Sequence, residues 1–84
     1  MAREFGPKWT LGYCWVEVTI LMGQFQGLAL YAKRKGEEPV RRIVATEMEA
    51  FGWLEENRVP KRWAEMLLKA ATAESSFQLS ETKE

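Results

Sequence analysis

The sequence predicts an α+β domain in which a three-stranded antiparallel β-meander is followed by a helical hairpin packed on one sheet face (β-β-β-α-α). Three features lead to this fold class. Side chains sort by alternate positions over residues 13–22, turns containing glycine or proline separate two further strand-like segments, and apolar residues recur at helical spacing over residues 46–73. We expect these elements to form a single domain over residues 13–73.

The first predicted strand, residues 13–22, is the segment richest in β-branched and aromatic side chains. Its even positions are Cys14, Val16, Val18, Ile20 and Met22. Its odd positions include Glu17 and Thr19, so we expect the even side chains to face the core. A helix is the alternative, because apolar residues from Trp15 to Ala32 also lie three or four positions apart. Composition favours the strand, since each glycine inside a helix would cost about 1 kcal/mol.

A hairpin is expected to join the first strand to the second. Residues 23–27 have a glycine at each end and read as a five-residue loop, which places Met22 opposite Leu28. The second strand, residues 28–35, then directs Leu30 towards the core together with the other even positions.

A second turn, residues 36–39, leads to the third predicted strand, residues 40–45. Pairing the ends of these two strands places Ile43 and Ala45 on the core face. Arg42 and Val44 are then expected on the opposite face.

The first helix is predicted over residues 47–56 by a capping box, in which the Thr46 hydroxyl accepts from the Glu49 amide and the Glu49 carboxylate reaches back to the Thr46 amide. We expect Asn57 to end this helix. Its apolar stripe is expected to consist of Met48, Phe51 and Leu54, with Trp53 at the flank.

Pro60 suits the first turn of a second helix, because the N–H that proline lacks has no partner there. The apolar positions of this helix are Trp63, Met66, Leu67 and Ala70. Outside the domain, residues 1–12 are expected to form an irregular or short extended arm, and residues 74–84 a flexible polar tail.

Composition limits the chemistry that the chain can perform. It has 84 residues, no His, no Asp and a formal net charge of zero. With no histidine base, no phosphate loop and no cluster of metal-binding residues, we expect neither enzymatic activity nor a bound cofactor or metal. Cys14 is the single cysteine, and we favour a buried structural role for it over a reactive thiol.

The sequence also indicates where the protein works. A lone cysteine and an N-terminus without a hydrophobic signal core indicate a cytoplasmic protein. The apolar runs are too short to span a bilayer, which needs about 20 residues, so we expect no membrane partner.

The candidate binding surface is the sheet face opposite the helices, together with the basic turn after the second strand. Its predicted residues are Tyr13, Trp15, Tyr31, Lys33, Arg34 and Arg42. Tyrosine, tryptophan and arginine dominate the energetics of many protein interfaces. Aromatic rings beside cations also suit single-stranded nucleic acid, and long cations can simply keep a sheet face soluble.

We therefore predict a small protein-binding module of the regulator or inhibitor type, which occludes a surface of its protein partner. A nucleic-acid-binding regulator is the alternative, and a structural role in a homo-oligomer, such as a homodimer, is the third hypothesis.

One local resemblance concerns the predicted helical hairpin. The segment from Trp53 to Trp63, with Arg58-Val59-Pro60 between its two helices, looks like the closing segment of some phage Cro-type repressors. The strand-rich first half of the chain departs from an all-helical repressor, and no residue role is carried over.

Overall fold

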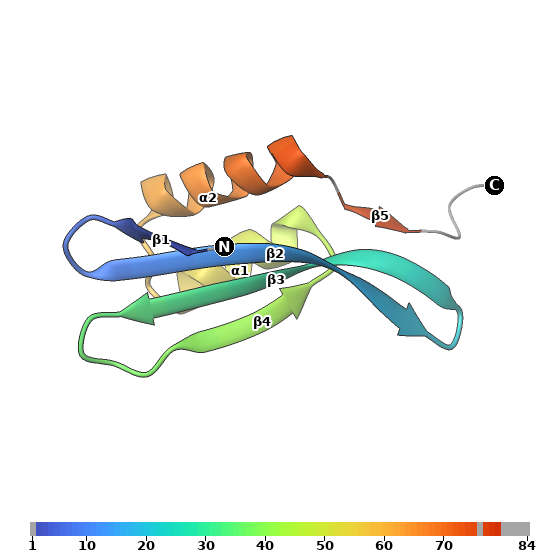
Figure 1. Cartoon of the computed structure of the whole chain (residues 1–84), viewed down its shortest axis with the longest axis horizontal. Coiled ribbons are helices and arrows are strands. Elements are labelled where there is room, and N and C mark those ends of the chain that lie inside the picture. The colour runs from blue at the N-terminus through green and yellow to red at the C-terminus, as the bar shows by residue number, and fades with distance from the viewer. Residues whose placement is uncertain (1, 76, 80–84) are drawn as a thin grey trace.

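The computed structural model describes residues 2–75 and 77–79 and has an α+β fold (Figure 1). Its elements in chain order are β1 (Ala2–Phe5), β2 (Trp9–Ile20), β3 (Gly23–Arg34), β4 (Val40–Val44), α1 (Glu47–Glu56), α2 (Lys61–Glu74) and β5 (Gln78–Leu79). The antiparallel sheet has the order β1-β2-β3-β4, and β5 also pairs with β3. The predicted fold class is confirmed, but the meander has one strand more than the three that were predicted.

The N-terminal segment, expected as an irregular or short extended arm, forms the edge strand β1. It pairs with β2 from Ala2 opposite Gly12 to Phe5 opposite Trp9. Gly6 makes the tight turn possible with a φ of 65°, which glycine adopts without strain. The Phe5 side chain is buried, so β1 contributes to the core.

The turn between β2 and β3 differs from the prediction and reverses the faces of β2. Ile20 pairs with Gly23, so the turn consists of Leu21 and Met22 rather than a five-residue loop. Because the register shifts by an odd number of residues, the odd positions of β2 face the helices. Their buried members are Trp9, Leu11 and Tyr13. The prediction that the even positions of β2 face the core was therefore wrong. Cys14, which is one of these positions, is exposed.

The pairing of β4 with β3 also differs from the predicted register by an odd number of residues. Leu28 pairs with Val44, and Ala29 pairs with Ile43. Val44 is therefore buried in the core, whereas Ile43 is 54% exposed on the opposite face. The prediction had these two residues exchanged. The even positions of β3 were assigned correctly, since Leu28 and Leu30 are both buried.

Helix α1 has the predicted bounds and the predicted cap. The Glu49 amide donates to Thr46 Oγ1 at 3.1 Å, and Glu49 Oε1 accepts from the amide of Ala45, rather than that of Thr46, at 2.7 Å. Its buried residues are Ala50, Trp53 and Leu54. Met48, expected in the stripe, is 84% exposed because the buried side of the helix is centred on Trp53 instead.

Helix α2 follows Pro60 as predicted and packs against β2. Its buried residues are Ala64, Leu67, Leu68 and Ala71. The predicted stripe was rotated by about one position, since Met66 is 49% exposed. Figure 1 shows both helices behind or above the sheet, so the front of the sheet in this view is not covered by either helix.

The segment after α2, expected as a flexible tail, is anchored as far as it is described. Glu74 is still helical, and the Ser75 hydroxyl donates to the Gln26 side chain at 2.8 Å. Gln78 and Leu79 then pair with β3. Residue 76 and residues 80–84 of the predicted tail lie outside the described residues.

Candidate binding surface

Two of the six predicted binding residues, Tyr13 and Trp15, lie on the helix side of the sheet. The Tyr13 phenol donates to Glu74 Oε2 at 2.5 Å, and Trp15 Nε1 donates to the Ala71 carbonyl at 2.9 Å. The Trp15 ring also meets Phe77 edge-on, with centroids 4.9 Å apart. Their predicted position on the open face was wrong, and both residues instead attach β2 to the C-terminal end of the chain.

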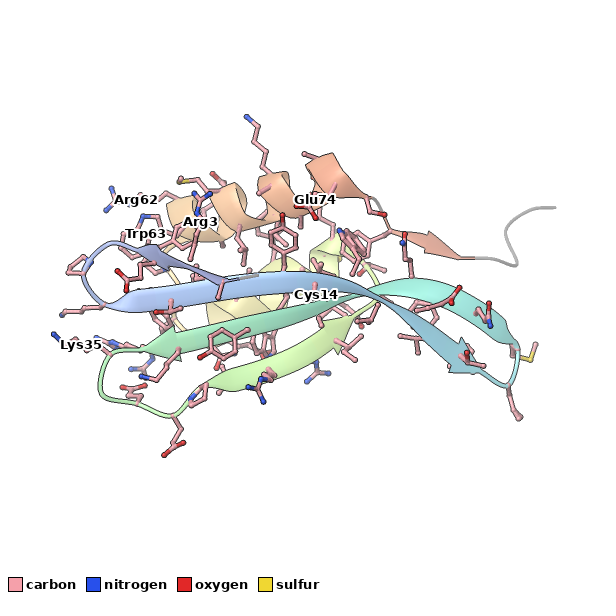
Figure 2. All side chains as sticks on the ribbon, viewed as in Figure 1. Arg3, Cys14, Lys35, Arg62, Trp63 and Glu74 are labelled. Atoms are coloured by element: carbon pink, nitrogen blue, oxygen red, sulfur yellow. The ribbon has the colours of Figure 1, made fainter. Side chains whose placement is uncertain are left out.

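We define the outer face as the sheet surface opposite the helices. It consists of the even positions of β1 and β2 and the odd positions of β3 and β4, which the strand pairing places on one side. Its members are Ala2, Glu4, Thr10, Gly12, Cys14, Val16, Val18, Ile20, Phe25, Gly27, Ala29, Tyr31, Lys33, Arg41 and Ile43. Figure 2 shows Cys14 in front of the sheet, on β2.

A shallow hollow of ≈ 620 Å³ lies near the middle of the outer face. Gly12, Cys14 and Ala29 form a floor of small side chains across β2 and β3, and Tyr31 and Ile43 stand beside it. The lining is mostly apolar. An open hollow bordered by large apolar side chains can accept a side chain of another molecule.

The position of Ile43 next to the hollow is fixed by its packing over Gly27. A Cβ atom at Gly27 would lie 2.9 Å from Ile43 Cγ2 and 3.2 Å from Val18 Cγ2, so these two side chains close over the glycine. The apolar surface continues along the hairpin to its tip, where Ile20 is 49% exposed and Leu21 91% exposed. Ile43 is therefore held in place while half of its surface remains accessible.

Cations lie between the first hollow, which Arg41 also lines, and the end of the outer face opposite the hairpin tip. The Arg41 guanidinium carbon lies 5.5 Å from the centre of the Tyr31 ring, directly across the strand pair. A second, mostly polar hollow of ≈ 330 Å³ is bordered by Lys8, Lys33 and Lys35, and also by the carboxylate of Glu4. The Lys35 amide donates to the Lys8 carbonyl at 2.7 Å, which holds the two basic turns side by side.

The structure thus brings together only part of the predicted site. Tyr31 and Lys33 lie on the outer face as expected. Arg34 pairs with Trp9, and Arg42 pairs with Leu30, so both occupy positions of the helix-facing side, although Arg42 also borders the larger hollow.

Sequence reasoning missed Arg41 and Ile43, because the predicted register of β4 directed them elsewhere. Once the pairing of Val44 with Leu28 is known, alternation places both on the outer face, with Arg41 opposite Tyr31 and Ile43 opposite Ala29.

Among the described residues, no group of three or more His, Cys, Asp or Glu side chains is placed to hold a metal ion. Cys14 is exposed rather than buried as expected, and its Sγ lies 3.7 Å from the Trp15 carbonyl. None of the helices in the described ranges has the length and apolar character needed to cross a membrane.

Comparison with protein families, curated proteins and solved structures finds no match for this chain.

Proposed function

We propose that this chain is a small, non-enzymatic protein-binding module that occludes a surface of its partner and so acts as a regulator or inhibitor. The observation that carries the proposal is the uncovered outer face, where Tyr31 and Ile43 stand beside a hollow floored by small residues. We place its action in the cytoplasm, where a single free cysteine remains reduced.

The composition of the outer face supports a protein partner. A contiguous apolar patch on a small protein is a common sign of an interaction site. Tyr31 and Arg41 add the residue types that contribute most to interface energetics, and their contact across the strands orders both side chains before binding. The strands provide a rigid support, so little ordering is required when the partner arrives.

Nucleic acid binding remains the second candidate because Lys8, Lys33 and Lys35 gather at one end of the outer face. The aromatic support for it is smaller than the sequence indicated. Tyr13 and Trp15 are held on the helix side. This leaves Tyr31, with Arg41 beside its ring, and Phe25 near the hairpin tip as the aromatic residues of the outer face. Binding of single strands usually depends on several stacked bases.

Affinity capture from an extract of the source cell separates the two candidates. The immobilised parent protein is compared with an Ile43→Glu variant, each with and without nuclease treatment, and oligonucleotide binding is measured at two salt concentrations. We expect a protein that is retained by the parent, resists nuclease and is lost with Ile43→Glu. Micromolar oligonucleotide binding with a steep salt dependence, and no protein retained, would contradict the proposal.

A further inference from the structure

We propose that the free edge of β2, the side of residues 14–20 that faces away from β3, binds an extended peptide segment of another protein. The segment adds to the sheet as a further antiparallel strand and contacts the backbone of Trp15, Glu17 and Thr19. It carries a lysine or arginine between two apolar residues. The site lies at a sheet edge rather than on the outer face, so it does not depend on the proposed function.

The edge of β2 that faces away from β3 is only partly covered. β1 occupies its first part, where the pairing ends with Ala2 opposite Gly12. Beyond this point, none of the strands within residues 2–75 and 77–79 pairs with this edge, because β4 and β5 both pair with β3. Towards the hairpin tip, Figure 1 shows β3 along one side of β2 and no other strand along the opposite side.

The hydrogen bond between Lys35 and Lys8 indicates which backbone groups of β2 point towards the free edge. Antiparallel partners alternate between pairs that exchange hydrogen bonds and pairs that do not. The Lys35 amide donates to the Lys8 carbonyl, and these two residues continue the register of β2 with β3, which runs without a bulge over the whole of β2. The even positions of β2 therefore bond to β3. The N–H and C=O groups of Trp15, Glu17 and Thr19 point to the free edge.

The free edge selects an extended backbone as its ligand. A strand offers N–H and C=O groups at the spacing of those on the edge, which a helix does not. β1 shows that the edge accepts a strand, since it pairs antiparallel with the preceding residues of β2. A segment opposite residues 15–19 would continue along the edge in the same direction as β1.

The side chains beside the free edge indicate the sequence of the segment. Glu17 is exposed on the side of the helices, whereas Val16 and Val18 are half-buried on the outer face. Directly opposed side chains in an antiparallel pair contact each other, and opposite charges contribute favourably. A lysine or arginine opposite Glu17 would meet its carboxylate, and the residues before and after it would lie beside the two valines. The segment that fits therefore has an apolar, a basic and an apolar residue in succession.

Glu17 also disfavours a second copy of this chain at the same edge. A twofold pairing centred on Glu17 would oppose two carboxylates. Shifting the register supplies no cation, because residues 13–22 contain neither lysine nor arginine. A segment of another protein that carries a basic residue is therefore the better ligand.

Amide hydrogen exchange measured by NMR tests the geometry of the free edge. In the protein alone, the amides of Trp15, Glu17 and Thr19 should exchange at least ~10-fold faster than those of Val16 and Val18, which bond to β3. Equal protection at odd and even positions would overturn the assignment of the edge. Protection of the odd positions that grows with protein concentration would mean that a second copy occupies the edge, and this would also overturn the proposal.

Binding is tested with a capped peptide whose centre is Thr-Val-Lys-Val-Thr, with the lysine opposite Glu17. The peptide should protect the amides of Trp15, Glu17 and Thr19, with a dissociation constant below about 1 mM. Two N-methylated peptides are matched controls. Methylation of the lysine amide removes a bond to β2 and should abolish binding, whereas a valine amide points away from β2 and its methylation should have much less effect. Equal binding of the two, or no protection at about 5 mM of the unmodified peptide, would contradict the proposal.

The preference for a basic residue is tested by exchanging the two charges. A peptide with glutamate in place of the lysine should bind the parent at least about fivefold more weakly, and Glu17→Lys should reverse this preference. Glu38→Lys is the control, because Glu38 is exposed in the turn before β4, and it should leave the preference unchanged. Circular dichroism verifies that both variants are folded. A folded Glu17→Lys protein that still prefers the lysine peptide would refute the assigned role of Glu17.

A Tyr31→Ala variant separates the free edge from the outer face. Tyr31 lies on β3 opposite Gly12, outside the segment 15–19 of β2, so this variant should bind the peptide like the parent. A loss of peptide affinity with Tyr31→Ala would place the contact on the outer face and overturn the edge site. If the peptide binds as expected but a captured protein binds Tyr31→Ala and the parent equally, the edge site is supported and only the proposed binding face is refuted.

Discussion

The Tyr13 phenol donates a hydrogen bond to the carboxylate of Glu74 at 2.5 Å, which joins the middle of β2 to the last residue of α2. Two residues along the same side of β2, Trp15 donates to the carbonyl of Ala71 on the same helix. These contacts fix which side of β2 faces the helices. The aromatic residues of this strand therefore serve mainly to stabilise the fold, and other residues form the outer face.

The Tyr13–Glu74 contact should make stability depend on alkaline pH. The hydrogen bond to Glu74, followed by burial and the negative charge of that carboxylate, raises the pKa of Tyr13 above its usual value of 10.0. A raised pKa in the folded state contributes stability that is complete below the unfolded-state pKa and decreases as pH rises through the folded-state value. The stability advantage of the parent over Tyr13→Phe should therefore shrink above about pH 10.

Urea unfolding of both proteins at about pH 8 and about pH 11 measures this difference directly, because other titrating groups are common to both. An advantage that is equal at the two pH values would mean that the phenol does not share its proton with Glu74 in the folded protein.

The turn before β2 provides a test of local packing. In Gly6→Ala the new Cβ would meet the indole ring of Trp63, and φ is 65°. Gly36→Ala is the matched control, because its φ of 84° imposes a similar backbone cost but nothing lies within 4 Å. We expect about 1 kcal/mol of destabilisation for Gly36→Ala and clearly more for Gly6→Ala in urea unfolding. Equal losses would show that Trp63 moves aside freely.

The cap of α1 should have a measurable energy. Thr46→Ala removes the acceptor of the Glu49 amide and should lower the free energy of unfolding by about 1 kcal/mol. Thr46→Ser retains an acceptor and should cost much less. Chemical denaturation of the three proteins tests this, and a loss for Thr46→Ala no greater than that for Thr46→Ser would count against the cap.

The two faces of the sheet should respond differently to truncation. Leu30 is 1% exposed, so Leu30→Ala should cost about 2–5 kcal/mol through lost burial and a remaining cavity. Ile43→Ala, on the outer face, should cost less than about 1.5 kcal/mol, since much of its side chain already meets water. Thermal and urea unfolding compare them, and similar losses would contradict the assigned faces.

The sequence predicted the elements better than their register. Local signals identified α1 to the residue, because the Thr46–Glu49 cap depends on neighbouring backbone groups. Strand faces depend on turn length, and a turn of Leu21 and Met22 contains no residue that marks it. The glycines at 23 and 27 favoured a longer loop, although only Gly23 has a positive φ and Gly27 makes room for Ile43.

The residues before the predicted start of β2 indicate which side of this strand is buried. Trp9 and Leu11 continue the odd positions of Tyr13 and Trp15, and this stripe of large side chains offers more burial than one containing Cys14. Treating residues 1–12 as an arm removed that evidence. The predicted binding site contained the same error, because its residues were chosen from the sheet face that each strand was expected to expose. The positions of Arg41 and Ile43 depend on how β4 pairs with β3, which the local sequence does not determine.

The affinity of the captured partner for two tyrosine variants tests the central claim, that the outer face binds and the opposite face holds the fold. Tyr31→Ala should weaken binding by about 30-fold or more, equivalent to about 2 kcal/mol, with little loss of stability. Tyr13→Phe, on the helix side, should reduce stability and leave affinity unchanged. Titration of the purified partner into each folded protein decides the matter, and a loss of affinity with Tyr13→Phe but not with Tyr31→Ala would contradict the account.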